Sequence, residues 1–423
     1  MPLAFCLLPT FSKNFAQLLK TMTTTTNLGS KPSVNSVSPL TWVKKNLFST
    51  WYNGILTILS LLFLYWIGLR LISWTFTQAR WGVIGANLRL FFVGLYPQTL
   101  IWRLWTSLGI IISLGGFSWG ILTSKGALLS RTTLIILGIL GTTCVALSLP
   151  AGIQSSLLLW GMLFLLVIGA VLGRRVGTKI PAIANWLPLI WLVTFFVLLW
   201  LLEGGLFLRQ VRRDDLSGLI LTLFVAIVSI VLSFPFGVLL ALGRQSSLPA
   251  IRWLSIAYIE LIRGLPLIGI LFMAQVMLPL VLPSGVRLER VVRAIAGFTI
   301  FTAAYLAESV RGGLQSVPRG QVEAAKALGL SPPLVLILIV LPQAIKAVIP
   351  TIVGQFISLF KDTSLLAIVG LVDLLGISQS ILASPKYLGR YGEIYLFIAF
   401  IYWICCYSMS LASRKLETKL GRE

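Results

Sequence analysis

The sequence predicts an all-α, polytopic membrane protein with about ten transmembrane helices. Hydrophobic residues make up 57% of the 423 residues and charged residues only 11%, and the mean hydropathy is +0.95. A soluble domain normally carries about 25% charged residues, so the solvent of most of this chain is a lipid bilayer. Apolar runs long enough to cross it occupy residues 53–76, 104–123, 132–150, 154–173, 182–202, 216–243, 255–282, 294–312, 336–360 and 393–413.

The charge balance fits this class. The chain has 34 Lys and Arg against 12 Asp and Glu, a net charge of +22. The basic residues are spread between the apolar runs instead of forming one patch, so we expect lipid and not nucleic acid as the partner. More of them fall on loops that are cytoplasmic if both termini are cytoplasmic. The sequence therefore predicts that orientation.

Residue types exclude several kinds of chemistry. The cysteines, Cys6, Cys144, Cys405 and Cys406, lie in or beside apolar runs and form neither a disulfide framework nor a metal-binding motif. The chain has no histidine, the commonest metal ligand and proton shuttle. It also has no GxxxxGK[ST] phosphate loop. We therefore expect no metal, no cofactor and no ATPase activity on this chain, and energy must come from a partner.

Four regions follow from composition. Residues 1–50 are rich in Ser, Thr, Asn and Lys and are predicted to be a disordered cytoplasmic tail, with Met22 as an alternative start. Residues 51–205 hold the first five apolar runs without a polar constellation and are predicted to be accessory membrane helices. A charged interruption ends that set, and residues 216–413 hold the second five apolar runs. Residues 414–423 are predicted to be a cytoplasmic C-terminal tail.

One motif in the second half has a defined spacing. Glu323-Ala324-Ala325 is followed after three residues by Gly329, and nine further residues lead to Ile339, one spacer and Leu341-Pro342. This pattern resembles, without a gap, the cytoplasmic EAA loop of permease subunits of binding-protein-dependent ABC importers. In that family the loop contacts the ATPase. The alternative is an ordinary amphipathic cytosolic loop.

The resemblance extends from residue 217 to about residue 420. It rests on Gly218–Leu223, Pro235–Arg244, Tyr258–Leu267, Ala303–Gly313 and Phe360–Leu365. These segments resemble the polar amino-acid branch of the family. The resemblance implies that the C-terminal five helices, in residues 216–413, form a transport domain with the MetI-like fold known from the methionine and maltose permeases. The extra N-terminal helices resemble the larger permease subunit of broad-range L-amino-acid importers.

The resemblance implies a function and its partners. It implies a permease subunit of an ATP-driven importer for polar or broad-range L-amino acids in a bacterial inner membrane. An ATPase dimer, which holds ATP and Mg, an extracytoplasmic amino-acid-binding protein and a second permease in a heterodimer would be its partners. The chain would be a transporter subunit and not an enzyme.

The residue types of the loop suit that coupling role. Ala324 and Ala325 allow close approach of a partner, and Glu323 offers a charge to a basic partner. Gly329 permits a sharp turn. The two prolines at 332 and 333 suit the first turn of the next helix, where a missing N–H costs little, and Pro342 completes the motif.

Glu308 is the clearest candidate for a substrate path. An acidic side chain within a membrane helix is costly and usually functional. Arg311 lies at i+3, so an intrahelical ion pair is one explanation. The other is that Glu308 meets the α-amino group or a cationic side chain of the substrate, with Tyr305 on the same face. Both interpretations stay open.

Two further polar groups are ambiguous. Asp362, Thr363 and Ser364 lie at the outer end of the ninth run, where they either line the outer entrance of the path or cap the helix. Glu260 and Arg263 are predicted to form a structural ion pair in a helix bent at Pro266.

Residues 366–392 are apolar but interrupted by glycines and prolines. They predict a re-entrant or surface-lying outer segment, suited to docking a binding protein, instead of an eleventh span.

An ion-coupled secondary amino-acid transporter is the alternative function. It predicts inverted repeats and broken helices near the membrane midplane. The first and second sets of five runs show no convincing similarity, and only the second carries motifs. The sequence therefore favours the ABC permease.

Overall fold

The computed structural model describes residues 39–123, 131–205, 207–283 and 288–420. Within these ranges every named element is helical, which confirms the all-α class. The chain divides into two compact units, Met1–Ala79 and Arg80–Glu423.

The first unit contains α2 (Pro39–Asn46) and α3 (Trp51–Thr77). The predicted tail, residues 1–50, is described only from Pro39, and α2 and the start of its connection to α3 make up that part. α3 matches the predicted run 53–76 and has no buried residue. An apolar helix exposed on all sides is stable where lipid surrounds it.

The second unit begins with a helix that hydropathy did not predict. α4 (Gly82–Val93) has 12 residues, or about 18 Å, which is too short to cross the hydrocarbon core. It packs against α8 (Gly218–Arg244), α16 (Leu374–Leu382) and α17 (Tyr391–Leu420). This part of the predicted accessory region is therefore joined to the transport domain.

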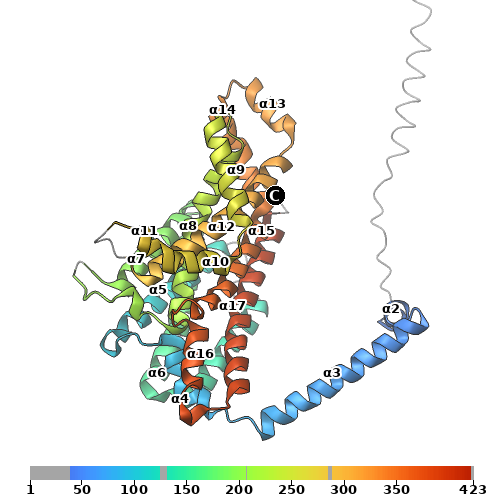
Figure 1. Ribbon diagram of the computed structural model, residues 1–423, viewed down its shortest axis with the longest axis vertical. Helices are drawn as coiled ribbons and strands as arrows, with labels where there is room; N and C mark the ends of the chain where they lie inside the picture. Colours follow the sequence, from blue (N-terminus) through green and yellow to red (C-terminus); the bar gives the residue numbers. More distant parts are fainter. Residues whose placement is uncertain (1–38, 124–130, 206, 284–287, 421–423) are drawn as a thin grey trace, which may run out of the picture. The chain divides into compact units, whose positions relative to one another are not determined.

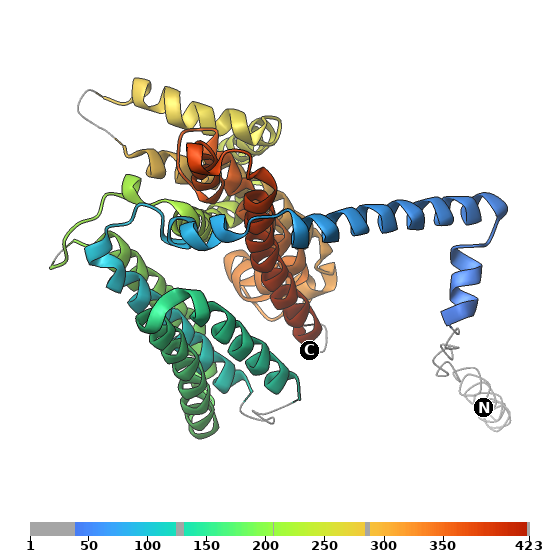
Figure 2. The ribbon, with the colours of Figure 1, turned by 90° about the horizontal axis from the view of Figure 1, so that it is seen from below.

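Three accessory helices follow: α5 (Ile101–Leu122), α6 (Arg131–Lys179) and α7 (Ile183–Glu203). Figure 2 shows them gathered on one side of the unit. α6 is one helical element where two runs, 132–150 and 154–173, were predicted.

Glycines set the contact between α5 and α6. A Cβ atom at Gly116 would lie 2.3 Å from the Leu166 carbonyl oxygen, and one at Gly120 would lie 2.1 Å from that of Ala170. From α6, a Cβ atom at Gly173 would lie 2.0 Å from the Phe117 carbonyl oxygen. Such close backbone approach between membrane helices requires small residues four apart. The register also shows that this half of α6 runs parallel to α5.

This parallel packing requires a reversal within α6. A straight helix from Arg131 to Arg174 would be about 65 Å long, yet the link from Thr123 to Arg131 spans about 29 Å at most. Arg174 lies beside Gly120, close to the end of α5. The first half of α6 therefore carries the chain back, and among the described residues of α6 only Ser156–Lys179 qualifies as a candidate span.

The transport domain continues with α9 (Pro249–Arg263), α10 (Leu267–Phe272), a π-helical turn (Met273–Met277) and α11 (Leu278–Val281). The predicted single run 255–282 is thus broken, and its two parts meet at 105°. The bend follows Gly264 and lies at Pro266, as predicted, because proline lacks the N–H that would continue the helix.

The remaining helices are α12 (Arg290–Ser316), α13 (Arg319–Ala327), α14 (Pro332–Val335), a π-helical turn (Leu336–Val340), α15 (Leu341–Asp362), α16 and α17. α16 has nine residues and does not span, as predicted for 366–392. α17 continues as helix to Leu420, into the predicted C-terminal tail. Among the described residues eight helices are long and apolar enough to cross a membrane, or nine if the bent pair is one span. The first half of α6 is outside that count.

α12 is the centre of the transport domain. It packs against α8, α9 and α15. Within an apolar stretch of 18 residues of this helix, 61% is buried. Small residues bring its neighbours close: a Cβ atom at Gly313 of α12 would lie 2.5 Å from the Ala344 carbonyl oxygen of α15. Figure 1 shows α13 and α14 at one end of this unit and α4 and α16 at the other. The loop with the EAA spacing therefore lies at the opposite end of this unit from α4 and α16.

The glycine contact gives a stability test. Gly173→Leu should lower the thermal unfolding midpoint by about 5 °C or more, because the new side chain overlaps the backbone of α5 and overpacking costs about 1–3 kcal/mol. Gly161→Leu on the same helix is the matched control, since a Cβ atom there meets nothing within 4 Å. Equal midpoints for the two variants, measured in detergent, would contradict the assigned contact.

Candidate coupling loop and transport site

The predicted coupling residues form a compact surface at one end of the unit. Glu323 and Ala324 are exposed on α13, whereas Ala325 is buried with 4% exposure. α13 packs against the π-helical turn 336–340. The loop thus presents a charge and a small side chain outward while Ala325 packs inward.

A glycine turn ends α13. Gly329 has φ +79°, its N–H donates to the Lys326 carbonyl oxygen, and the Leu330 N–H donates to that of Ala325. These bonds form a Schellman motif, in which the left-handed residue is normally glycine. The motif leaves the neighbouring Leu328 82% exposed, an apolar side chain at the tip of the loop.

The chain then returns to the transport domain as predicted. The prolines at 332 and 333 occupy the first turn of α14, and Pro342 begins α15 after the π-helical turn. The Gln343 amide nitrogen lies 3.5 Å from the Gln321 amide oxygen, which links α15 to α13. Pro342 therefore lies at the base of the loop, while Glu323 to Gly329 form its tip.

Glu308 lies in a charge cluster that joins three helices. The ion pair with Arg311, one of the two explanations left open, is present: Arg311 Nε donates to both carboxylate oxygens at 3.0 Å. Arg244 Nη1 from α8 lies 3.4 Å from Glu308 and Arg263 Nη1 from α9 lies 3.7 Å from it. Arg244 also contacts Glu260 at 2.9 Å. The predicted Glu260–Arg263 pair is wrong, because each side chain reaches a partner on another helix.

The cluster has a surplus of positive charge and incomplete hydrogen bonding. Three guanidinium groups face two carboxylates. The Arg263 guanidinium lies 5.6 Å from the centre of the Tyr305 ring, and its Nε is buried without a partner in the described structure. Buried polar atoms are normally paired. An unpaired one beside a net positive charge suits an anionic ligand group.

Gln355 of α15 adds a second unpaired atom. Its amide nitrogen donates to the Tyr305 carbonyl oxygen at 3.1 Å and to the Ser309 hydroxyl at 2.7 Å, whereas its Oε1 is buried without a partner in the described structure. The sequence analysis assigned no role to Gln355, and it missed Arg244 as a partner of Glu308. Their partners come from other helices, so no spacing within one helix could reveal them.

The structure does not bring the other predicted path residues to this cluster. Asp362 ends α15, and Ser364 is half-buried in the turn beyond it. Thr363 is fully buried, and its hydroxyl donates to the Phe360 carbonyl oxygen at 2.6 Å. For Thr363 this geometry favours the capping interpretation. Within the described residues, no group of three His, Cys, Asp or Glu could hold a metal ion.

A polar cluster that the sequence analysis missed joins α8, α16 and α17. Asp373 is fully buried and caps α16 by accepting from the Gly376 N–H at 2.9 Å and the Leu375 N–H at 3.2 Å. The Tyr402 hydroxyl lies 3.5 Å from it, and the Thr222 hydroxyl accepts from the Leu374 N–H. The signal was present: an Asp just before an apolar run is a typical N-cap.

Comparison with known proteins decides the family. The protein-family model described as "Binding-protein-dependent transport system inner membrane component" matches residues 233–422. The inner membrane amino-acid ABC transporter permease protein YhdY of Escherichia coli (strain K12) is 36% identical over 92% of this chain and 95% of its own length. The chain belongs to this family of inner membrane transport components. It is therefore a multi-pass inner membrane permease and not an enzyme.

Other relatives match all or half of this permease. The glutamate/glutamine/aspartate/asparagine transport system permease protein BztC of Rhodobacter capsulatus is 36% identical over 92% of this chain and 95% of its own length. The probable glutamine ABC transporter permease protein GlnP of Bacillus subtilis is 41% identical over 48% of this chain and 92% of its own. A solved structure titled "Crystal structure of an amino acid ABC transporter with histidines" is 31% identical with a TM-score of 0.44, over 48% of this chain and 92% of its own.

Asp373 gives a prediction about pH. Burial raises its pKa from 3.8 to about 6. Because the folded pKa lies above the ordinary value, protonation stabilises the folded state: this contribution is present below about pH 4 and is lost as pH rises through about 6. A shift of one pKa unit corresponds to about 1.4 kcal/mol. The free energy of unfolding of the wild-type permease should therefore fall by about 2–3 kcal/mol between pH 4 and pH 8.

Asp373→Asn tests this directly. Asparagine keeps an oxygen that can cap α16 but does not titrate, so the fall in the unfolding midpoint from pH 4 to pH 8 should shrink. Asp373→Ala, which loses the cap, should be less stable than Asp373→Asn throughout. Identical pH profiles for wild type and Asp373→Asn would contradict the assignment.

Proposed function

We propose that the chain is the permease subunit of an ATP-driven importer for polar or broad-range L-amino acids. The names of its relatives support amino acids as the substrate class. The family makes an ion-coupled secondary transporter the weaker alternative. ATP and Mg bind a separate ATPase dimer, an extracytoplasmic binding protein delivers the substrate, and a second permease completes a heterodimer. This chain carries no cofactor, and both its termini are cytoplasmic.

The loop from Glu323 to Gly329 couples the permease to the ATPase. Its geometry carries the proposal: an exposed charge, an exposed Leu328 and a fixed glycine turn lie at the tip of a helix that is short and projects from the unit (Figure 1). The tip is connected to α12 through Val317 and Pro318 and to α15 through α14. Movement of the ATPase surface is thereby passed to two adjacent helices of the transport domain.

The charge cluster lies on the substrate path. An amino-acid zwitterion needs a donor for its carboxylate and an acceptor for its ammonium group. Arg263 Nε and Gln355 Oε1 are the unpaired donor and acceptor, and Tyr305 lies between their helices. Glu308 is held by three arginines, so its part in the path is to position them. Asp362, Thr363 and Ser364 stay proposed as the outer end of the path, and residues 366–392 as the docking segment for the binding protein.

Uptake measurements test the coupling role. A strain that lacks this gene should lose uptake of one or more labelled L-amino acids, and the wild-type gene should restore it. Glu323→Lys should reduce the restored uptake roughly tenfold or more, because a reversed charge is repelled by a basic ATPase surface. Immunoblots of the membrane fraction check that the variant is present at the wild-type level. Full uptake with Glu323→Lys would remove the coupling role of this residue.

The glycine turn gives a matched pair. Gly329→Ala puts a side chain at φ +79°, which costs about 1–2 kcal/mol, and should reduce uptake while the membrane level is unchanged. Gly320→Ala on the same loop has an ordinary backbone angle and open space around it, and should leave uptake at the wild-type level. Equal uptake by both variants would contradict a coupling role for the turn.

Arg263 tests the substrate path. Arg263→Gln should raise the KM of uptake roughly tenfold, since a hydrogen bond to a charged group contributes about 1.5–3 kcal/mol. Arg252→Gln on the same helix is the control, because Arg252 is exposed and outside the cluster. An unchanged KM with Arg263→Gln would place the substrate elsewhere.

A further inference from the structure

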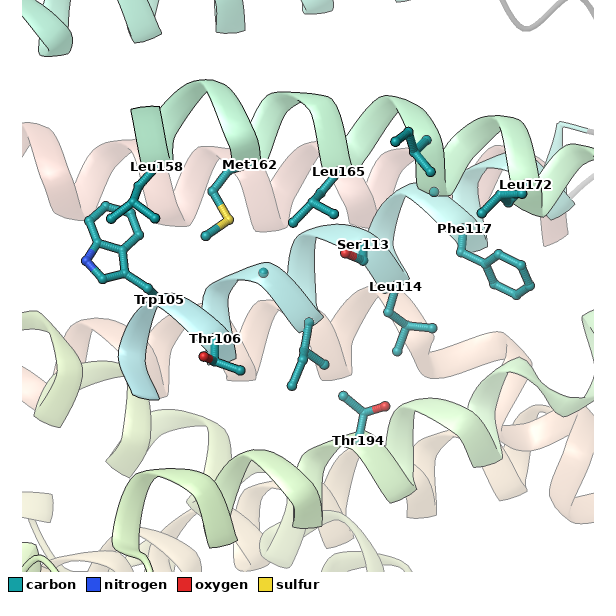
Figure 3. Close-up of a pocket in the computed structure, with 14 residues that line it drawn as sticks. Trp105, Thr106, Ser113, Leu114, Phe117, Leu158, Met162, Leu165, Leu172 and Thr194 are labelled. Carbon is teal, nitrogen blue, oxygen red and sulfur yellow. The ribbon is translucent and has the colours of Figure 1, made fainter. Parts of the chain in front are cut away.

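An apolar cavity lies between α5, α6 and α7, away from the proposed path. Its volume is about 830 Å³, and it is lined from Trp105 to Phe117 of α5, from Leu158 to Leu172 of α6 and by Thr194 of α7. Figure 3 shows Leu158, Met162 and Leu165 facing α5 along its length. The part of α6 that lines the cavity is about 21 Å long. The hydrocarbon core of one leaflet is about 15 Å thick. The cavity therefore has the length of a single acyl chain.

The two threonine hydroxyls of the lining are satisfied within their own helices. The Thr106 hydroxyl donates to the Trp102 carbonyl oxygen at 2.9 Å, and the Thr194 hydroxyl donates to that of Ile190 at 2.8 Å. Among the described residues, no charged side chain lines the cavity. A polar ligand would lose its hydrogen bonds to water and find few in return. The chemistry of the lining thus selects an apolar occupant.

The cavity-lining stripe of α6 leads directly to two cations. Leu158, Leu165 and Leu172 recur every seven residues, which places them on one face of the helix. Arg175 and Lys179 follow Leu172 at i+3 and i+7 on the same face, and both are exposed. A molecule with its chain in the cavity would have its polar end beside them.

Two ion pairs show which end of the bundle carries these cations. Glu203, at the end of α7, bonds Arg213 at 2.6 Å, and Arg213 bonds Glu289, just before α12, at 3.2 Å. α13 follows the opposite end of α12. α7 therefore begins, and α6 ends, at the end of the bundle that carries the coupling loop. In the proposed orientation this is the cytoplasmic leaflet, which holds anionic lipid.

The sequence reinforces the charge argument. No Asp or Glu occurs before Glu203, while Lys and Arg recur throughout that region. Residues 51–202 thus offer no carboxylate to neutralise Arg175 and Lys179, and Glu203 is paired with Arg213. A phosphate group of a lipid would do so.

We propose that this cavity binds one acyl chain of an anionic phospholipid, whose phosphate contacts Arg175 and Lys179. The lipid fills the space that the glycine-packed helices leave beside α7. It stabilises the accessory helices on their cytoplasmic side. The binding is non-covalent.

Native mass spectrometry of the full-length chain, purified with its partner subunits, tests the proposal. Phosphatidylglycerol and phosphatidylethanolamine are added in equal amounts to delipidated protein. We expect one phosphatidylglycerol to be retained per chain in preference. The double variant Arg175→Gln and Lys179→Gln should weaken its retention roughly ten- to thirtyfold, since each cation contributes about 1 kcal/mol. Arg252→Gln with Arg414→Gln, which removes two exposed cations elsewhere, should not.

A second pair of variants tests the cavity itself. Gly109→Leu should block retention of both lipids, because a Cβ atom there is in ordinary contact with Met162 and Leu165 and a longer side chain extends into the cavity. Gly115→Leu on the same helix meets nothing within 4 Å and should leave retention unchanged. Equal retention of the two lipids, or retention that Gly109→Leu does not reduce, would overturn the proposal. The second result would indicate that another occupant, such as a helix of the second permease, covers this face.

Discussion

Close contact between small residues is the constraint on which this structure depends. Lipid is as apolar as leucine, so burial alone does not hold membrane helices together, and packing has to do so. Gly116, Gly120 and Gly173 bring α5 and α6 into backbone contact, and Gly313 does the same for α12 and α15. The cavity between α5, α6 and α7 lies directly beside this contact, since Gly109 of α5 and Gly169 of α6 belong to its lining. The backbones of α5 and α6 thus meet at one wall of the cavity, where a Cβ atom at Gly169 would lie 2.5 Å from the Ser113 carbonyl oxygen.

Polar side chains then fix the two ends of α8. At its start, the Gly218 N–H donates to the Val372 carbonyl oxygen and the Thr222 hydroxyl accepts from the Leu374 N–H. At its end, Arg244 reaches Glu260 and Glu308. Each cluster joins at least three segments through groups that would be costly to leave unpaired in lipid. α8 therefore connects a polar cluster built on backbone and hydroxyl hydrogen bonds at one end of the permease to an ion-pair cluster at the other.

Sequence reasoning succeeded where the cause is local and failed where partners come from distant segments. Hydropathy located the spans, and the spacing around Gly329 indicated a turn that the backbone adopts with φ +79°. The i,i+3 spacing of Glu308 and Arg311 allowed the ion pair that the structure contains. The same rule gave the wrong partner for Glu260, because Arg244 of another helix lies closer. α4 escaped detection since a helix of 12 residues is below the length that a membrane-span search requires.

The arrangement of α12 and α15 explains how a loop at the end of the molecule can act on the charge cluster. α13 follows α12 directly and is joined to α15 through α14, and α12 and α15 meet without intervening side chains at Gly313. Further along, Gln355 of α15 bonds the Tyr305 carbonyl oxygen and the Ser309 hydroxyl of α12. Close-packed helices move by discrete steps and not by continuous deformation. A displacement of α13 that shifts α15 against α12 therefore breaks or remakes the Gln355 bonds, beside the unpaired Arg263 Nε. The proposed coupling loop and the proposed substrate contact thus share one helix pair.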